Sequence, residues 1–179
     1  MPDPKGHKMT AEEYFNTPET NKHMELRDGV LTEFATPTPE HQDIVGGLYA
    51  EIRSFIRTNG GSCKPFISPL DVKLDDYNVV QPDVFVICDS SKYDDKRCYG
   101  APDWVIEVLS TNRSDDLYRK LALYQAHGVR EYWIIDPMYK RTMVYFFEKS
   151  DFPVIYTFDT DIPVGIYDGK LNICIKDLL

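Results

Sequence analysis

Two stretches of this chain place apolar residues at the spacing of an α-helix. The first runs from about residue 39 to residue 58 and is expected to end at Gly60. The second follows Ser114, a candidate cap, and ends at Gly128. A shorter helix is predicted at residues 10–15, because its first and fourth residues, a threonine and a glutamate, have the spacing of a capping box.

Between these stretches, short runs of β-branched and aromatic residues predict strands. Asp28-Gly29 is a preferred hairpin turn, so the segments 23–27 and 30–34 are expected to pair. A strand, a helix and a strand follow one another between Trp104 and Asp136, within roughly thirty residues, which predicts a parallel crossover. The other strands are expected at residues 63–67, 70–74, 83–88, 104–109, 131–136, 143–147, 154–158 and 171–175.

The fold class predicted by these elements is α/β, a mixed β-sheet flanked by helices. With 179 residues, of which 42% are hydrophobic, the chain suits one domain over residues 1–179 with a loose tail at 1–8. The net charge of −9 has the wrong sign for a protein that binds nucleic acid over a wide surface, since such binding depends on Lys and Arg. Any contact with nucleic acid must use a local basic patch or a metal ion.

The four cysteines show no spacing typical of a metal knuckle, which favours free thiols in a reducing compartment. No apolar run approaches the roughly 18 residues of a membrane span, so we expect no membrane contact and a cytoplasmic location. The sequence also contains no nucleophile elbow, P-loop or zinc-protease motif.

Two carboxylates inside apolar strands are the first candidates for chemistry. Asp103 and Glu107 share one face of the 104–109 strand but lie ~13 Å apart, too far to hold one ion. Asp83, at the start of the preceding apolar strand, is the natural partner of Glu107. Two carboxylates ~4 Å apart repel by about 4 kcal/mol at an effective dielectric of 20. Either one of them is protonated or a cation lies between them, and oxygen ligands favour magnesium, manganese or calcium.

Lys120 is the third candidate. It lies three residues after Leu117 and four before Tyr124, on or beside the helix stripe that faces the sheet. From there its ammonium can reach the carboxylates, hold an attacking water or neutralise charge on a phosphate. The alternative is an ordinary surface ion pair with Asp116, four residues earlier.

These residues belong to an ordered set that resembles a known family. The set consists of Pro82-Asp83, Glu107-Val108-Leu109-Ser110, Asp116, Lys120, Tyr124, Gly128-Val129, Glu131-Tyr132-Trp133 and Asp136-Pro137. It resembles the PD-(D/E)XK nuclease superfamily and, within it, the Uma-two group of small restriction-endonuclease-like proteins. The resemblance covers about residues 10–137, and residues 101–137 are its most specific part.

The resemblance implies a restriction-endonuclease-like core, with additional strands after it, and a set of site residues. Asp83 and Glu107 would bind the metal, and Lys120 would be the catalytic lysine. Glu25 matches an acid near the site, also a metal ligand, and His41 matches a recurring histidine there. The superfamily usually places its lysine two residues after the acid, a position taken here by Leu109, so the lysine resembles one that has moved to the following helix.

Several of these residues have simpler alternatives. Glu25 could be a solvated hairpin carboxylate, and His41 could cap its helix or pack at its start. Asp136 is better explained as a turn residue, and Asp103 as a strand-end cap. His127 favours a helix C-terminus when charged.

The function implied is a metal-dependent endonuclease that uses Mg²⁺ or Mn²⁺ and cleaves nucleic acid, with DNA as the expected substrate. Tyr124 and Trp133 are expected in the core, not as platforms for bases. A local cationic rim of Arg113, Arg119, Lys140 and Arg141 would contact phosphates. A homodimer is expected, because cutting two strands usually needs two sites. The alternative is an inactive relative that keeps the fold and acts as a binding or assembly module.

The sequence leaves open whether the aromatic residues Tyr145, Phe146 and Phe147 supply a dimer surface or complete the core.

Overall fold

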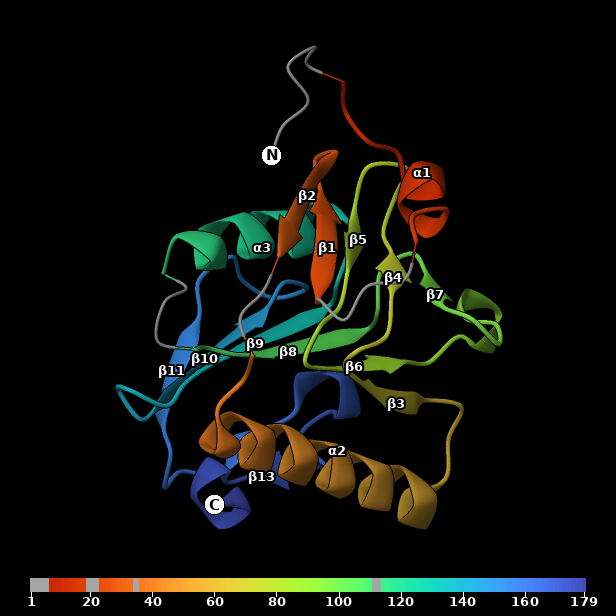
Figure 1. Ribbon diagram of the computed structural model, residues 1–179. Coiled ribbons are helices and arrows are strands. Elements are labelled where there is room, and N and C mark those ends of the chain that lie inside the picture. Colours follow the sequence, from red (N-terminus) through yellow and green to blue (C-terminus); the bar gives the residue numbers. More distant parts are fainter. Residues whose placement is uncertain (1–6, 19–22, 34–35, 111–113) are drawn as a thin grey trace.

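A six-stranded mixed sheet forms the centre of the molecule (Figure 1). The computed structural model describes residues 7–18, 23–33, 36–110 and 114–179, without the side chains of residues 114–118. The helices are α1 (Ala11–Phe15), α2 (Pro39–Asn59) and α3 (Ser114–Ala126), with the 3-10 helices η1 (Ser90–Lys92), η2 (Gly165–Tyr167) and η3 (Ile175–Leu178). The central sheet has the order β11-β10-β9-β8-β6-β3.

The strands of the central sheet are β3 (Lys64–Ile67), β6 (Val84–Ile87), β8 (Trp104–Val108), β9 (Glu131–Asp136), β10 (Arg141–Phe146) and β11 (Val154–Thr157). Strands β8 and β9 are parallel, and their neighbours in the sheet pair antiparallel. Helix α3 joins β8 to β9, so the predicted parallel crossover is confirmed. The carboxyl ends of β8 and β9 therefore lie at the same edge of the sheet.

A second sheet carries the N-terminal hairpin and has the order β2-β1-β5-β4-β7. Its strands are β1 (Met24–Arg27), β2 (Val30–Glu33), β4 (Val72–Lys73), β5 (Val79–Val80) and β7 (Cys98–Tyr99). Asp28 and Gly29 both have positive φ, of 50° and 75°, as the tightest hairpin turns require. The predicted hairpin is confirmed; its last predicted residue, Phe34, lies outside the described residues.

Each face of the central sheet is covered. On one face, Ile44, Leu48 and Ile52 of α2 pack with Trp104 and Trp133 of the sheet. This side also includes the C-terminal segment with β12 (Ile162–Pro163) and β13 (Asn172–Ile173). The other face packs against Tyr124 of α3 and against residues of the second sheet. Figure 1 shows α2 and α3 on opposite sides of the sheet.

The predicted helices agree with the structure. Thr10 and Glu13 form the capping box of α1, and Thr38 caps α2, whose first residue is Pro39. The predicted cap at Ser114 involves side chains that the structure does not describe, and residues 1–6 of the predicted tail are also outside it. Among the described helices, none has the length and apolar character needed to cross a bilayer.

The prediction of four free thiols is wrong. Cys63 and Cys88 form a disulfide, while Cys98 and Cys174 are free. The β3–β6 ladder explains the pairing: it matches Lys64 with Ile87, so one further step brings the two cysteines opposite each other. A disulfide is unusual in a reducing compartment, which weighs against the cytoplasmic location that remains a prediction.

Candidate functional site

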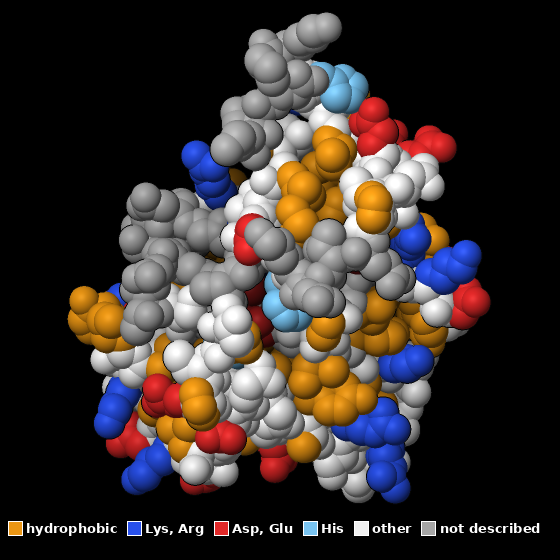
Figure 2. Space-filling view, in the orientation of Figure 1, with side chains coloured by type: hydrophobic (Ala, Val, Ile, Leu, Met, Phe, Trp, Pro, Cys, Tyr) orange, Lys and Arg blue, Asp and Glu red, His pale blue; other side chains and the backbone are white. Residues whose placement is uncertain are grey.

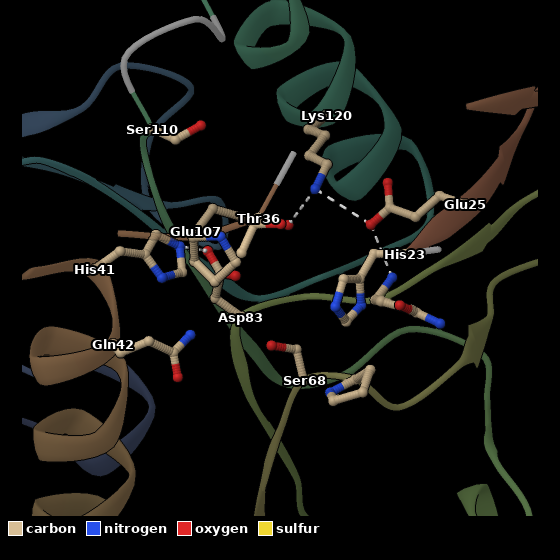
Figure 3. Close-up of a pocket in the computed structure, with 13 residues that line it drawn as sticks. His23, Glu25, Thr36, His41, Gln42, Ser68, Asp83, Glu107, Ser110 and Lys120 are labelled. Carbon is tan, nitrogen blue, oxygen red and sulfur yellow. Dashed lines mark hydrogen bonds and ion pairs between the residues drawn. The ribbon is translucent and has the colours of Figure 1, made fainter. Parts of the chain in front are cut away.

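A pocket of about 370 Å³ opens between the N-terminal hairpin, the start of α2 and the carboxyl end of β8. Figure 2 shows acidic atoms deep in a hollow near the centre of this face, beside a histidine. The five residues selected from the sequence, Glu25, His41, Asp83, Glu107 and Lys120, all line it. The other lining residues carry no formal charge when the histidine is neutral: His23, Thr36, Pro37, Gln42, Ser68, Pro69, Gln81 and Ser110 (Figure 3).

Strand pairing brings Asp83 and Glu107 together. The β6–β8 ladder matches Val84 with Ile106, so one further step places Asp83 opposite Glu107. The backbone N–H of Val108 donates a hydrogen bond to Asp83 Oδ2 at 2.8 Å. Asp83 and Glu107 are 9% and 4% exposed. The two carboxylates therefore converge as expected, on the sheet face that also contacts α3.

Glu107 lies among donors from α3. Lys120 Nζ and the Tyr124 hydroxyl each donate to Glu107 Oε1 at 2.8 Å. Burial raises the pKa of Glu107 to about 7; the Lys120 ammonium opposes this rise, and the charges of Asp83 and Glu25 add to it. The charge of Glu107 is therefore governed by Lys120 and the two neighbouring acids together.

Lys120 is buried, so the alternative of an exposed surface pair does not describe it. Its ammonium lies 2.8 Å from Glu107 Oε1 and 3.3 Å from Glu25 Oε1 (Figure 3). Burial alone would lower the pKa of Lys120, but the two carboxylates outweigh it and raise that pKa above its usual value. The side chain of Asp116, the alternative partner, is outside the described residues.

Glu25 is 1% exposed, which contradicts the alternative of a solvated hairpin carboxylate. The backbone N–H of Gln81 donates to its Oε1 at 2.8 Å. Its Oε2 is shielded from solvent, accepts no hydrogen bond from the described residues and lies 3.4 Å from Arg27 Nε. The hairpin thus places Glu25 in the pocket, where both of its carboxylate oxygens already face protein groups.

His41 is buried at the start of α2, with its Nε2 at 3.2 Å from Asp83 Oδ2. Its backbone N–H donates to the Thr38 hydroxyl, so Thr38 is the cap and His41 is not. His41 therefore bridges α2 to the carboxylate pair, and a catalytic role for it stays a prediction.

The remaining candidates have structural roles. Asp136 accepts from Tyr139 N–H and pairs with Arg141, as a turn residue does. Asp103 accepts from Cys88 N–H at the end of β6. His127 Nδ1 and Nε2 lie 2.7 Å from the Leu123 carbonyl and the Asp75 carboxylate, near the C-terminal end of α3. Tyr124 and Trp133 are fully buried. The interpretations of Asp136, Asp103, Tyr124 and Trp133 are confirmed, while the role of His127 at the helix C-terminus stays a prediction.

The predicted cationic rim is described only in part. Arg119 is exposed on α3, Lys140 lies in the β9–β10 connection, and Arg141 is the first residue of β10. That connection follows the carboxyl end of β9, at the sheet edge where Glu107 lies. Arg113 is outside the described residues.

Sequence reasoning missed three residues that organise the site. Tyr124 was expected only to fill the core, yet its hydroxyl donates to Glu107. Gln81 and Arg27 hold Glu25. A signal existed for Gln81, which directly precedes Pro82-Asp83, whereas nothing in the local sequence indicates that its N–H meets a side chain from a distant hairpin.

The donor atoms of the pocket suit a hard divalent cation. Asp83 Oδ1 and Glu107 Oε2 make no hydrogen bond with the described residues, whereas the other oxygen of each has partners. Mg²⁺ commonly takes one or two carboxylates and keeps several waters. In the part of the chain that the structure describes, no three His, Cys, Asp or Glu side chains form a metal cage. Two carboxylates with one unpartnered oxygen each, as described, therefore fit a hydrated magnesium or manganese ion.

Comparisons with known proteins concern the family and the fold of the chain. A family model, Uma2, described as "Putative restriction endonuclease", matches residues 11–155. A crystal structure described as a putative nuclease belonging to DUF820 from Anabaena variabilis is 24% identical and superposes with a TM-score of 0.79. The superposition covers 95% of this chain and 97% of that one. At this identity the likeness shows the fold, and it confirms the predicted fold class. The comparison with curated proteins found no match.

Proposed function

The chain belongs to the Uma2 family of putative restriction endonucleases, and on this basis we propose that it is a metal-dependent endonuclease that hydrolyses phosphodiester bonds of DNA. One observation carries the proposal. Asp83, Glu107 and Lys120 come from three separate segments and converge in one pocket, with one oxygen of each acid directed to no protein donor among the described residues.

In the proposed mechanism, Asp83 Oδ1 and Glu107 Oε2 would hold Mg²⁺ or Mn²⁺. When bound, the ion supplies Lewis acidity, which lowers the pKa of a coordinated water and stabilises charge on phosphate. The Lys120 ammonium orients the attacking water or offsets the negative charge that develops on the phosphate. His41 keeps Asp83 in place through their contact. Arg119, Lys140 and Arg141 supply phosphate contacts that the net charge of −9 does not.

Plasmid cleavage in the presence of Mg²⁺ tests this proposal. Asp83→Asn, Glu107→Gln and Lys120→Gln should each reduce nicking by about 10²-fold or more, because each removes a charge from the reacting centre. Asp103→Asn is the matched control: it removes a carboxylate from the other end of β8, where the side chain contacts Cys88 N–H and Arg130. Equal nicking by all the variants would show that the activity belongs to a contaminant or another site.

A second candidate is an inactive relative that binds or assembles without cutting. It is favoured by Leu109, which occupies the usual lysine position and packs against the core. Manganese titration separates the two, because the inactive module should bind no ion in a manner that depends on Glu107.

We also propose that the chain works as a homodimer. Tyr145 and Phe147 are partly buried and pack on the core, so they do not form an open surface. Phe152, Val154 and Ile155, on and beside the edge strand β11, are 81%, 56% and 59% exposed. An apolar sheet edge of this kind favours pairing with another chain.

A further inference from the structure

The pocket already contains a cation that faces the proposed metal ligand. Lys120 Nζ lies 2.8 Å from Glu107 Oε1, and its side chain is only 5% exposed. An ammonium in this position neutralises the same carboxylate that a divalent ion would use. Like charges in one low-dielectric pocket repel each other, so an ion bound to Glu107 favours movement of the ammonium away from this carboxylate.

Glu25 offers the ammonium a second acceptor at short range. Its Oε1 is 3.3 Å from Lys120 Nζ, so the lysine contacts both acids at once (Figure 3). A rotation of the lysine side chain can thus transfer the ammonium from one acid to the other without movement of α3.

Glu25 itself is poorly placed to bind an ion. Its Oε2 is shielded from solvent opposite Arg27 Nε, and its Oε1 already accepts from Gln81 N–H and Lys120. A hydrated divalent ion needs an oxygen that its waters can surround. This arrangement disagrees with the expectation from the resemblance that Glu25 is a metal ligand.

We propose that Lys120 is a resident counter-ion of Glu107 which a divalent ion must displace, and that Glu25 is a positioning residue that retains the ammonium afterwards. This inference rests on the proposed function, since it assumes that the ion binds Asp83 and Glu107. It gives the two acids that contact Lys120 different roles: Glu107 binds the ion, and Glu25 acts only through the lysine.

The test is calorimetric titration of the full chain with Mn²⁺ at one fixed pH and salt concentration. Lys120→Met should bind Mn²⁺ about tenfold more tightly than wild type, or more, because the competing charge is gone. Tyr124→Phe is the matched control, since it removes the other donor to Glu107 Oε1 without changing any charge, and it should alter the affinity far less.

Glu25 is tested in two backgrounds. Glu25→Gln should weaken Mn²⁺ binding in wild type, because the ammonium then stays on Glu107. In the Lys120→Met background the same substitution should have no effect. A loss of affinity in that background would make Glu25 a ligand and overturn its assignment as a positioning residue.

The competition itself is overturned if Lys120→Met binds Mn²⁺ no more tightly than wild type. Failure of the underlying metal site has another signature: Asp83→Asn and Glu107→Gln would then bind Mn²⁺ as wild type does. Removal of the ammonium leaves two buried acids without the positive charge of Lys120, which destabilises the fold. Lys120→Gln, which keeps a neutral hydrogen-bond donor, is therefore titrated alongside. Circular dichroism verifies that each variant is folded, and Lys120→Gln decides the outcome if Lys120→Met is not.

Discussion

Two buried glutamates, Glu131 and Glu107, serve different purposes, which their donors distinguish. Glu131 is fully buried on β9 and accepts from Trp133 Nε1, Gly165 N–H and Ile166 N–H, so every one of these donors is a structural group. It fastens the C-terminal segment to the central sheet. Glu107 instead meets a lysine and keeps one oxygen toward a pocket. The type of donor, which the sequence around a glutamate does not reveal, separates the anchor from the candidate ligand.

Glu131 predicts a pH dependence of stability. Burial raises its pKa above the ordinary 4.5, against the lowering effect of its three donors. The folded state then holds the proton more tightly than the unfolded state. The stabilisation from this group is therefore complete below pH 4.5 and is lost as pH rises through the folded pKa. In denaturant unfolding between about pH 4 and pH 8, the stability of wild type relative to Glu131→Gln should fall with rising pH.

Glu148 supplies a control of opposite sign. Its hydrogen bonds with Arg130 lower its pKa, so the stability of wild type relative to Glu148→Gln should rise with pH instead. If the stability of wild type relative to Glu131→Gln also rose with pH, the three donors would lower the pKa of Glu131 more than burial raises it. The folded state would then favour the charged carboxylate.

At the scale of elements, the sequence predicted whatever depends on local periodicity. Helix α2 and the β8–α3–β9 crossover follow from apolar spacing and cap residues. The two-residue strands β5, β7 and β12 were missed, because their pairing is set by tertiary contacts and not by local pattern. The convergence of Asp83 and Glu107 depends on ladder register, which apolar spacing does not give. The neighbouring position of the two strands in the sequence and the family resemblance both suggested it, and the register now explains it.

The disulfide between Cys63 and Cys88 also depends on the register of two strands. The pattern of apolar and polar residues therefore could not predict it. Cys63 and Cys88 are separated by 25 residues, a loop whose closure stabilises a fold by about 3 kcal/mol. In unfolded, unreduced protein, alkylation should label two of the four cysteines, and after reduction all four. Reduction should also lower the melting temperature of wild type and leave that of Cys63→Ser/Cys88→Ser unchanged. Labelling of all the cysteines without reduction would show that the bond is absent.

At the scale of the whole molecule, an acidic protein must act on a polyanion through one restricted region. The acidic side chains that line the pocket are buried, and the positive charges of Lys120 and Arg27 offset their negative charges. The basic candidates for phosphate contact lie on α3 and at the β9–β10 connection. Under the proposed function, a single pocket would cut one strand at a time, so cleavage of both strands would require either two binding events or two copies of the chain.

The oligomeric state of the chain distinguishes two binding events from two copies, and the apolar edge of β11 is the proposed interface between copies. If two copies associate there, light scattering after size-exclusion chromatography should give twice the chain mass, and Ile155→Lys should give the monomer, because a lysine on an edge strand opposes pairing. Val30→Lys is the matched control: Val30 is 50% exposed on β2, an edge strand of the second sheet, and its substitution should leave the dimer intact.

Ile155→Lys should still nick plasmid, since its pocket is complete, but should linearise it more slowly. A dimer that survives Ile155→Lys and separates with Val30→Lys would place the interface on the second sheet.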